Sequence, residues 1–216
     1  YGLPEVNREK IKNAQIIANP GCYPTAIQLA LVPLLKEGLI DPLSIIADAK
    51  SGISGAGKKN KVDLLMSEAS ENFQAYSLTG HRHQPEIEEN LIHNSLLGNV
   101  KLLFIPHLLP IARGIHATVY VNCVKDFDPS VIFSKYYEKE PFVDVMEANS
   151  CPETKSVRAS NMCRISFYKV PDTQQLVILS VIDNLVKGAA GQAVQNMNVM
   201  MNWDEALGLK LIPLVP

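Results

Sequence analysis

The sequence lacks the features that mark nucleic-acid-binding and membrane proteins. It carries 22 acidic and 20 basic residues, for a formal net charge of −2, and no basic block stands out. A nucleic-acid partner is therefore not expected. No apolar run approaches the ~20 residues that a membrane-spanning helix needs, so no membrane partner is expected either.

Cysteine is sparse, and its spacing fits neither a metal site nor a disulfide framework. The four cysteines are Cys22, Cys123, Cys151 and Cys163, and no two of them form a C-x-x-C pair. This argues against a zinc ribbon or a thioredoxin-type site. Four cysteines in 216 residues are also too few for a disulfide scaffold. We expect reduced thiols, no bound metal and a cytoplasmic location.

The remaining composition is that of a globular protein, with 47% hydrophobic and 19% charged residues. Apolar patterns predict strands and helices in a mixed order. The expected strands cover 14–18, 43–49, 73–78, 100–106, 114–124, 142–146, 162–169 and 176–183, and the expected helices cover 23–38, 61–72, 81–97, a segment from 128, and 186–201. This mixture predicts an α+β fold with helices on one face of a mixed sheet.

The most informative residue is Cys22, in the run Asn19-Pro20-Gly21-Cys22-Tyr23-Pro24-Thr25. A sharp turn places this thiol at the predicted start of a helix. Unpaired backbone N–H groups and the helix dipole favour an anion there. Such a position lowers the pKa of a cysteine and favours the nucleophilic thiolate. The alternative interpretation is a small, buried, unreactive cysteine at a helix cap.

A second polar run lies at the predicted start of the helix 81–97. His81 and His83 flank Arg82, and Glu86 follows in the first turn. A histidine here could serve as the general acid or base for thiolate chemistry. Arg82 could pair with an anionic substrate. A plain polar helix cap is the alternative.

Three further segments have a composition suited to binding. The glycine-rich run 51–57 begins with Ser51 and resembles a Walker A loop, but Lys59 stands where Ser or Thr is needed. Such a loop can still bind an anion through its N–H groups, or it can be a flexible connection. Arg113 precedes a strand and could bind a carboxylate or phosphate, or lie on the surface. The small residues of 183–193 allow close approach of a backbone or of a flat ring.

Four of these runs together resemble the N-acetyl-γ-glutamyl-phosphate reductases, a family related to the aspartate-semialdehyde dehydrogenases. They are the cysteine run 19–25, the loop 51–57, the His-Arg-His-Gln-Pro-Glu-Ile run 81–87, and the run Lys187-Gly188-Ala189-Ala190-Gly191-Gln192-Ala193. The resemblance spans nearly the whole chain. The cysteine and histidine motifs in this order are its most specific part.

The resemblance implies reduction of N-acetyl-γ-glutamyl phosphate to N-acetyl-L-glutamate 5-semialdehyde and phosphate by NADPH, in arginine biosynthesis. Cys22 matches the nucleophile that forms a thioester, and His81 matches the acid/base residue, with His83 as the second candidate. The implied substrate-binding residues are Ser51, Arg82, His83, Glu86 and Arg113, and those facing the nicotinamide of NADP are Asn184, Gly188, Gly191 and Gln192.

The resemblance also implies a fold and an assembly. The expected fold is a mixed, largely antiparallel sheet with helices on one face, like the C-terminal domain of glyceraldehyde-3-phosphate dehydrogenase, and the expected assembly is a homo-oligomer, either dimer or tetramer. The family has an N-terminal Rossmann domain, and its fingerprint is absent from this sequence. We therefore expect a catalytic and dimerisation domain at 1–183, and a C-terminal helix and tail at 184–216 that would pack on the Rossmann domain.

Other functions remain compatible with the sequence. An aspartate-semialdehyde dehydrogenase, or a reductase of carrier-bound aminoadipyl or glutamyl phosphate, would share the chemistry and differ in substrate. A Cys-His hydrolase or acyltransferase would need only Cys22 and a histidine. A non-catalytic interaction module would need neither.

Overall fold

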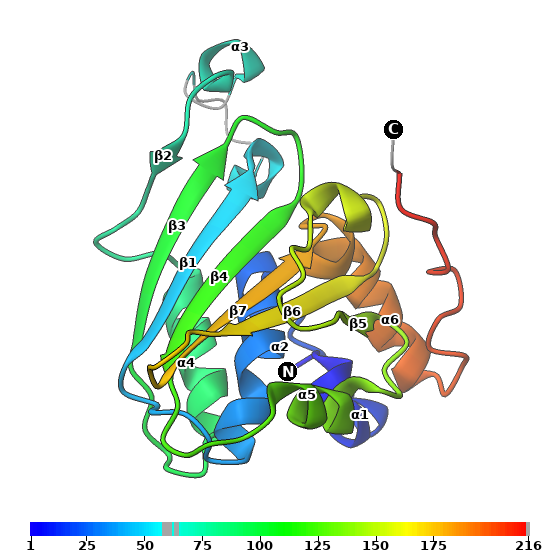
Figure 1. Ribbon diagram of the computed structural model, residues 1–216. Helices are drawn as coiled ribbons and strands as arrows, with labels where there is room; N and C mark the ends of the chain where they lie inside the picture. Colours follow the sequence, from blue (N-terminus) through cyan, green and yellow to red (C-terminus); the bar gives the residue numbers. More distant parts are fainter. Residues whose placement is uncertain (58–61, 63–64, 215–216) are drawn as a thin grey trace.

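The computed structural model describes residues 1–57, 62 and 65–214. Its centre is a seven-stranded sheet with the strand order β2-β3-β1-β4-β7-β6-β5 (Figure 1). The strands are β1 (Ile45–Gly52), β2 (Gln74–Ala75), β3 (Leu102–Leu109), β4 (Ile115–Asn122), β5 (Val143–Val145), β6 (Cys163–Lys169) and β7 (Gln175–Ile182). Two neighbouring pairs, β1–β3 and β5–β6, are parallel, and the other four are antiparallel. The predicted mixed, largely antiparallel sheet is confirmed.

Helices cover one face of this sheet. They are α1 (Pro4–Lys12), α2 (Cys22–Lys36), α3 (Met66–Ala69), α4 (His83–Asn94), α5 (Pro129–Tyr137) and α6 (Gly191–Met200), with the π-helix η4 (Val186–Ala190) directly before α6. Helix α2 contacts β4 and β7, and in Figure 1 it lies behind the sheet with α4 beside it. Burial of apolar side chains between α2 and the sheet forms the main core.

Helix α2 is buried almost along its whole length. Thirteen of its 15 residues are buried, from Tyr23 to Leu35. Pro33 lies inside the helix without ending it, although proline removes one backbone hydrogen bond there. Cys22, the first residue of α2, is therefore held by a helix that is packed into the core.

The opposite face of the sheet carries large exposed side chains. Ile46, Leu103, Tyr120 and Tyr168 are 38%, 54%, 42% and 44% exposed, and they come from four different strands. This face is the one toward the viewer in Figure 1. Within the part of the chain that the structure describes, no helix is both long enough and apolar enough to cross a membrane.

Several predicted elements are wrong or displaced. Residues 14–18 form no strand; Ile16 is 89% exposed, so the apolar run has no sheet neighbour to pack on. The expected strand 73–78 is reduced to the two residues of β2, and β3 continues past the expected strand end at residue 106 as far as Leu109. The expected helix 61–72 lies partly outside the described residues, and its described part contains only the short α3.

The C-terminal helix packs on the N-terminal one. Helix α6 contacts α1, and its polar side chains Gln192, Gln195 and Asn196 are buried. Two of its apolar residues, Met197 and Met201, are 42% and 55% exposed. A boundary at residue 183 stays a prediction.

Candidate active site

Cys22 is the first residue of α2, and Gly21 is its extended N-cap, with φ −68° and ψ 164°. The Gly21 carbonyl accepts the N–H of Thr25 at 3.0 Å, which begins the helix. A Cβ atom on Gly21 would lie only 2.6 Å from Nε2 of His83. Glycine is therefore required here to let the imidazole approach the backbone beside the thiol. The predicted thiol at a helix start is confirmed.

The turn before Cys22 is held by Glu86. Oε1 of Glu86 accepts the N–H of Gly21 at 2.9 Å and the hydroxyl of Tyr1 at 2.7 Å. Gln28 donates to the same tyrosine hydroxyl at 2.9 Å. The sequence predicts that Glu86 orients substrate, whereas the structure places this carboxylate on the loop backbone. Its work in this structure is to hold the turn that presents Cys22.

The two histidines occupy different surroundings. Nδ1 of His81 accepts the backbone N–H of His83 at 3.1 Å, and Nε2 of His81 lies 3.5 Å from the hydroxyl of Tyr76. His83 is only 8% exposed, and its Nδ1 has no hydrogen-bond partner. Tyr76 also donates to the hydroxyl of Tyr23 at 3.2 Å. The sequence analysis did not identify Tyr76, although this tyrosine lies only five residues before His81.

The pKa values show that burial dominates this site. Burial raises the pKa of the Cys22 thiol, and it outweighs the backbone N–H groups of Tyr23 and Cys22 and the charge of Arg82, which lower it. The predicted low pKa is therefore wrong for the unliganded protein, because the thiol is enclosed. Burial, followed by the charge of Arg82, lowers the pKa of His81. Burial and the neighbouring charges of His81 and Arg82 lower the pKa of His83 to about 4.

The low pKa of His83 predicts a loss of stability in acid. Between pH 6.5, the ordinary pKa of histidine, and about pH 4, His83 binds a proton in the unfolded chain but not in the folded protein. The free energy of unfolding should fall through this window by roughly 3 kcal/mol, at about 1.4 kcal/mol per pKa unit. We expect His83→Gln to remove most of this pH dependence in urea unfolding at pH 7 and pH 4. His93→Gln, on an exposed position of the same helix, is the control and should leave it unchanged.

Ser51 and Asn184 belong to a tight backbone junction near the end of β1. The hydroxyl of Ser51 is buried and donates to the carbonyl of Gly52 at 2.9 Å. Oδ1 of Asn184 accepts the N–H of Gly114 at 2.6 Å, and its Nδ2 donates to the hydroxyl of Ser54 at 3.0 Å. Asn184 thus joins the end of the sheet to the glycine-rich loop.

Arg113 is paired inside the protein. Its Nε lies 2.7 Å from Oδ2 of Asp183, and its second nitrogen donates to Oδ1 at 2.9 Å. The carboxylate of Asp183 is 0% exposed, while the arginine side chain is 28% exposed. The sequence predicts a substrate contact for Arg113; in the structure its charge is paired with Asp183, and one of its N–H groups donates to that carboxylate. Asp183 opens the run 183–193, but nothing in the sequence indicates that its carboxylate pairs with Arg113.

The glycines of the 183–193 run serve close packing within the chain. A Cβ atom on Gly188 would lie 2.6 Å from Cβ of Cys22, and one on Gly191 would meet the side chains of Asn161 and Val186. Gln192 is 0% exposed and donates to the carbonyl of Gly2 at 2.9 Å. The structure therefore brings Gly188 to the thiol and encloses Gly191 and Gln192. Their contact with a cofactor stays a prediction.

No three metal-binding side chains gather among the described residues. The described cysteines are all unpaired thiols, with Cys22 half-buried, Cys123 and Cys163 buried and Cys151 exposed. The site is thus built from one half-buried thiol, two imidazoles, a tyrosine hydroxyl and an exposed arginine. This set is suited to nucleophilic attack by sulfur with proton transfer by a neighbouring side chain.

Comparison with known proteins agrees with this geometry. N-acetyl-gamma-glutamyl-phosphate reductase from Nitrosomonas eutropha is 55% identical over 217 residues, covering 100% of this chain and 63% of that protein. The chain thus spans less than two thirds of this curated relative.

Solved structures with a similar fold carry a related name. Aspartate semialdehyde dehydrogenase II from Vibrio cholerae matches with a TM-score of 0.72 at 18% identity, over 92% of this chain and 67% of that one. Aspartate semialdehyde dehydrogenase with NADP from Candida albicans matches with a TM-score of 0.62 at 14% identity, over 92% and 63%. At these identities the likeness establishes the fold.

A family model covers the part of the chain that holds the site. The model of the semialdehyde dehydrogenase dimerisation domain matches residues 22–184, from Cys22 at the head of α2 to Asn184 after β7. This chain belongs to the semialdehyde dehydrogenase family, through its dimerisation domain.

Proposed function

We propose that the protein carrying this chain reduces N-acetyl-γ-glutamyl phosphate to N-acetyl-L-glutamate 5-semialdehyde and phosphate with NADPH, in cytoplasmic arginine biosynthesis. The observation that carries the proposal is Cys22, at the head of a buried helix with His81, His83 and Arg82 around it. The relative from Nitrosomonas eutropha, named for this reaction, supports the choice of substrate.

In the first step His81 takes the proton of the Cys22 thiol, and the sulfur attacks the acyl carbon of the acyl phosphate. A carbon–sulfur bond forms, the carbon–oxygen bond to phosphate breaks, and phosphate leaves with the electron pair. The backbone N–H groups at the start of α2 are placed to donate to the oxygen of the tetrahedral intermediate. Arg82, whose charge acts on Cys22 and both histidines, offsets the negative charge of the substrate.

Ser51, His83 and Arg113 take supporting roles in this proposal. The imidazole of His83 packs against Gly21, in the turn that precedes Cys22. Arg113 retains donors beyond those bound to Asp183. Ser51 is buried beside the loop 53–57 and helps to shape it.

The proton transfers are assigned to His81. Its side chain is half-buried, and its ring contacts those of Tyr23 and Tyr76 edge-on, with centroids 5.6 Å apart in each case. When bound, NADPH supplies a hydride to the thioester carbon. His81 then donates a proton to the resulting oxygen and takes it back as the carbon–sulfur bond breaks, which releases the aldehyde and restores the thiolate. His83, with a pKa of about 4, is neutral at pH 7 and is the weaker candidate.

The four residues assigned to the cofactor differ in their surroundings. Gly188 packs against Cys22, next to the reacting sulfur, while Asn184 joins the end of the sheet to the glycine-rich loop. Gly191 packs against Asn161, and Gln192 donates to the carbonyl of Gly2, so their assignment to the cofactor has less support. The NADP-bound relative from Candida albicans, with the same fold, supports the choice of NADP.

We place a second copy of the chain on the exposed face of the sheet. The matched family is a dimerisation domain, which implies a homo-oligomer. Ile46, Leu103 and Tyr120 project from neighbouring strands on that face and are at least 38% exposed. Burial of such apolar side chains is the usual driving force for association.

The reaction is tested by phosphate-dependent reduction of NADP⁺ by the full protein. N-acetylglutamate semialdehyde is the substrate and aspartate semialdehyde the comparison, because the Vibrio cholerae structure is named for the latter. We expect turnover with the first substrate alone. Turnover with aspartate semialdehyde alone would replace the proposed function by the second one.

Replacement of His81 by asparagine tests the acid/base assignment. We expect kcat to fall by about 100-fold or more, since a positioned acid/base contributes roughly 10²–10⁴. His83→Asn is the matched control, and its loss should be smaller. A larger loss for His83→Asn than for His81→Asn, measured at the same pH, would move the proton-transfer role to His83.

A further inference from the structure

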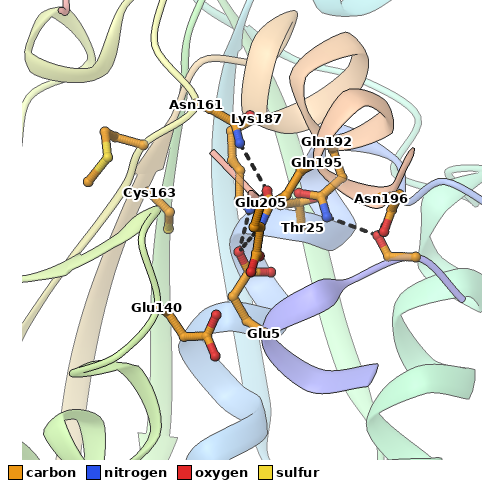
Figure 2. Close-up of polar contacts among 12 residues, drawn as sticks. Glu5, Thr25, Glu140, Asn161, Cys163, Lys187, Gln192, Gln195, Asn196 and Glu205 are labelled. Carbon is orange, nitrogen blue, oxygen red and sulfur yellow. Dashed lines mark hydrogen bonds and ion pairs between the residues drawn. The ribbon is translucent and has the colours of Figure 1, made fainter. Parts of the chain in front are cut away.

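A fully buried ion pair lies behind the active site. The ammonium of Lys187 is 2.5 Å from Oε1 of Glu5, and both side chains are 0% exposed. Lys187 also donates to Oε1 of Gln195 at 2.8 Å, and Gln195 donates to Oε1 of Glu5 at 3.0 Å. Figure 2 shows the lysine directed toward these side chains. The pair joins the π-helix η4 to α1, residues that are 182 positions apart in sequence.

The surroundings of this pair are polar. Gln195 donates its second bond to Glu205 at 2.8 Å, and Asn161 donates to Gln195 at 2.9 Å (Figure 2). Burial alone would raise the pKa of Glu5, but the charge and hydrogen bond of Lys187 give a net lowering. The contacts with Lys187 thus favour the charged carboxylate of Glu5 over the neutral acid.

Stability alone does not explain such a pair. A buried ion pair loses the hydration of both charges, and well-packed apolar residues of similar volume are often as stable or more stable. Helix α6 nevertheless turns its polar side inward and leaves Met197 and Met201 exposed. A buried polar network of this kind fixes the relative positions of the helices that it joins, because each hydrogen bond tolerates only a narrow range of distances and angles.

The element that this pair anchors is the one that touches the thiol. Lys187 and Gly188 are neighbours in η4, and a Cβ atom on Gly188 would lie 2.6 Å from Cβ of Cys22. A second link joins η4 to the cysteine turn, since Asn19 donates to the carbonyl of Ala189 at 3.2 Å. π-helical turns are frequent at functional sites. A shift of Lys187 would therefore move the surface on which Cys22 rests.

We propose that Lys187, anchored by Glu5, is a positioning residue for the Cys22 thiol. Glu5 fixes the lysine, the lysine fixes η4, and η4 holds Cys22 against the backbone N–H groups and the arginine charge that favour its thiolate. The inference about kcat rests on the proposed reductase function. The inference about the reactivity of the thiol does not.

Two variants separate position from charge. Glu5→Asp keeps both charges but draws the anchor back by one methylene group, and Lys187→Met removes the ammonium at similar length. Phe133→Leu, in a buried position on α5, is the control for loss of stability without a link to η4. If Lys187→Met does not fold, the positioning role can still be tested with Glu5→Asp.

The readout is the rate of alkylation of each cysteine by iodoacetamide in the full protein, resolved by peptide mass spectrometry across pH. We expect both variants to slow the reaction of Cys22 by roughly tenfold, since small misplacements at a reacting centre have effects of this size or larger. Exposed Cys151 should react at an unchanged rate and serves as the internal reference. In the reductase assay, kcat should fall by a similar factor, with KM within about twofold.

The outcomes distinguish the two proposals. Unchanged Cys22 reactivity in Glu5→Asp and Lys187→Met, or an equal loss in Phe133→Leu, would overturn the positioning role. Slower Cys22 alkylation in the two variants, in a protein with no reductase activity, would support the positioning role and reject the proposed function.

Discussion

Replacement of Cys22 by serine is expected to remove nearly all reductase activity while leaving the fold intact. Serine has nearly the same size as cysteine, so the packing at the head of α2 is conserved. Its hydroxyl is a far weaker nucleophile than a thiolate, and the thioester cannot form. We expect a loss of at least about 1,000-fold in kcat/KM, measured as NADP⁺ reduction with N-acetylglutamate semialdehyde and phosphate.

Cys151→Ser is the matched control for this prediction. Cys151 is exposed, whereas Cys22 is half-buried at the site, so the same chemical change at residue 151 should leave kcat/KM unaltered. Thermal unfolding of both variants checks that the fold is retained. Turnover of Cys22→Ser within tenfold of the parent protein would rule out the thioester mechanism.

Replacement of Asp183 by alanine is expected to produce the largest loss of stability. This carboxylate is 0% exposed and binds Arg113 through both oxygens. It also accepts the backbone N–H of Ala159 at 2.6 Å and that of Leu185 at 2.8 Å. Removing the carboxylate leaves the guanidinium of Arg113 and these two N–H groups without their acceptor. We therefore expect the free energy of unfolding to fall by about 3–5 kcal/mol.

Urea unfolding at pH 7 measures this loss. The matched control is Asp144→Ala, which breaks the Asp144–Arg164 pair, in which the two side chains are 40% and 34% exposed. An exposed pair contributes about 0–1 kcal/mol, so the control should change little. Equal losses in the two variants would show that burial and backbone contacts of Asp183 contribute nothing beyond an ordinary surface pair.

Local sequence patterns predicted the elements whose burial is periodic. The strand around 115–122 alternates between core and open face, and an apolar run behind Cys22 forms the buried helix α2. The same kind of pattern wrongly predicted a strand at residues 14–18. Apolar composition shows that a segment can pack, but it does not show whether a neighbouring strand is there to pair with it. The extended chain there runs along the surface, with Ile16 89% exposed.

The candidate site was predictable in its residue types and less so in its contacts. Cys22 and the two histidines were found from motifs, and the structure brings them together. Arg113 and Glu86 were found as well, and their substrate contacts stay predictions, but their contacts with Asp183 and the Gly21 backbone were not predicted. These partners are 70 and 65 residues away in sequence, and no local pattern connects them.

The amino-acid sequence by itself predicted the candidate nucleophile Cys22, the helix that begins at it and the semialdehyde dehydrogenase family, because each depends on runs of neighbouring residues. The tertiary structure alone decided the direction in which the pKa of the Cys22 thiol shifts, because burial raises it where a helix start predicts a lower value. It also decided the role of Lys187, whose partner Glu5 lies at the other end of the chain. Desolvation and ion pairing depend on which distant groups share a buried volume, and only the folded chain brings those groups together.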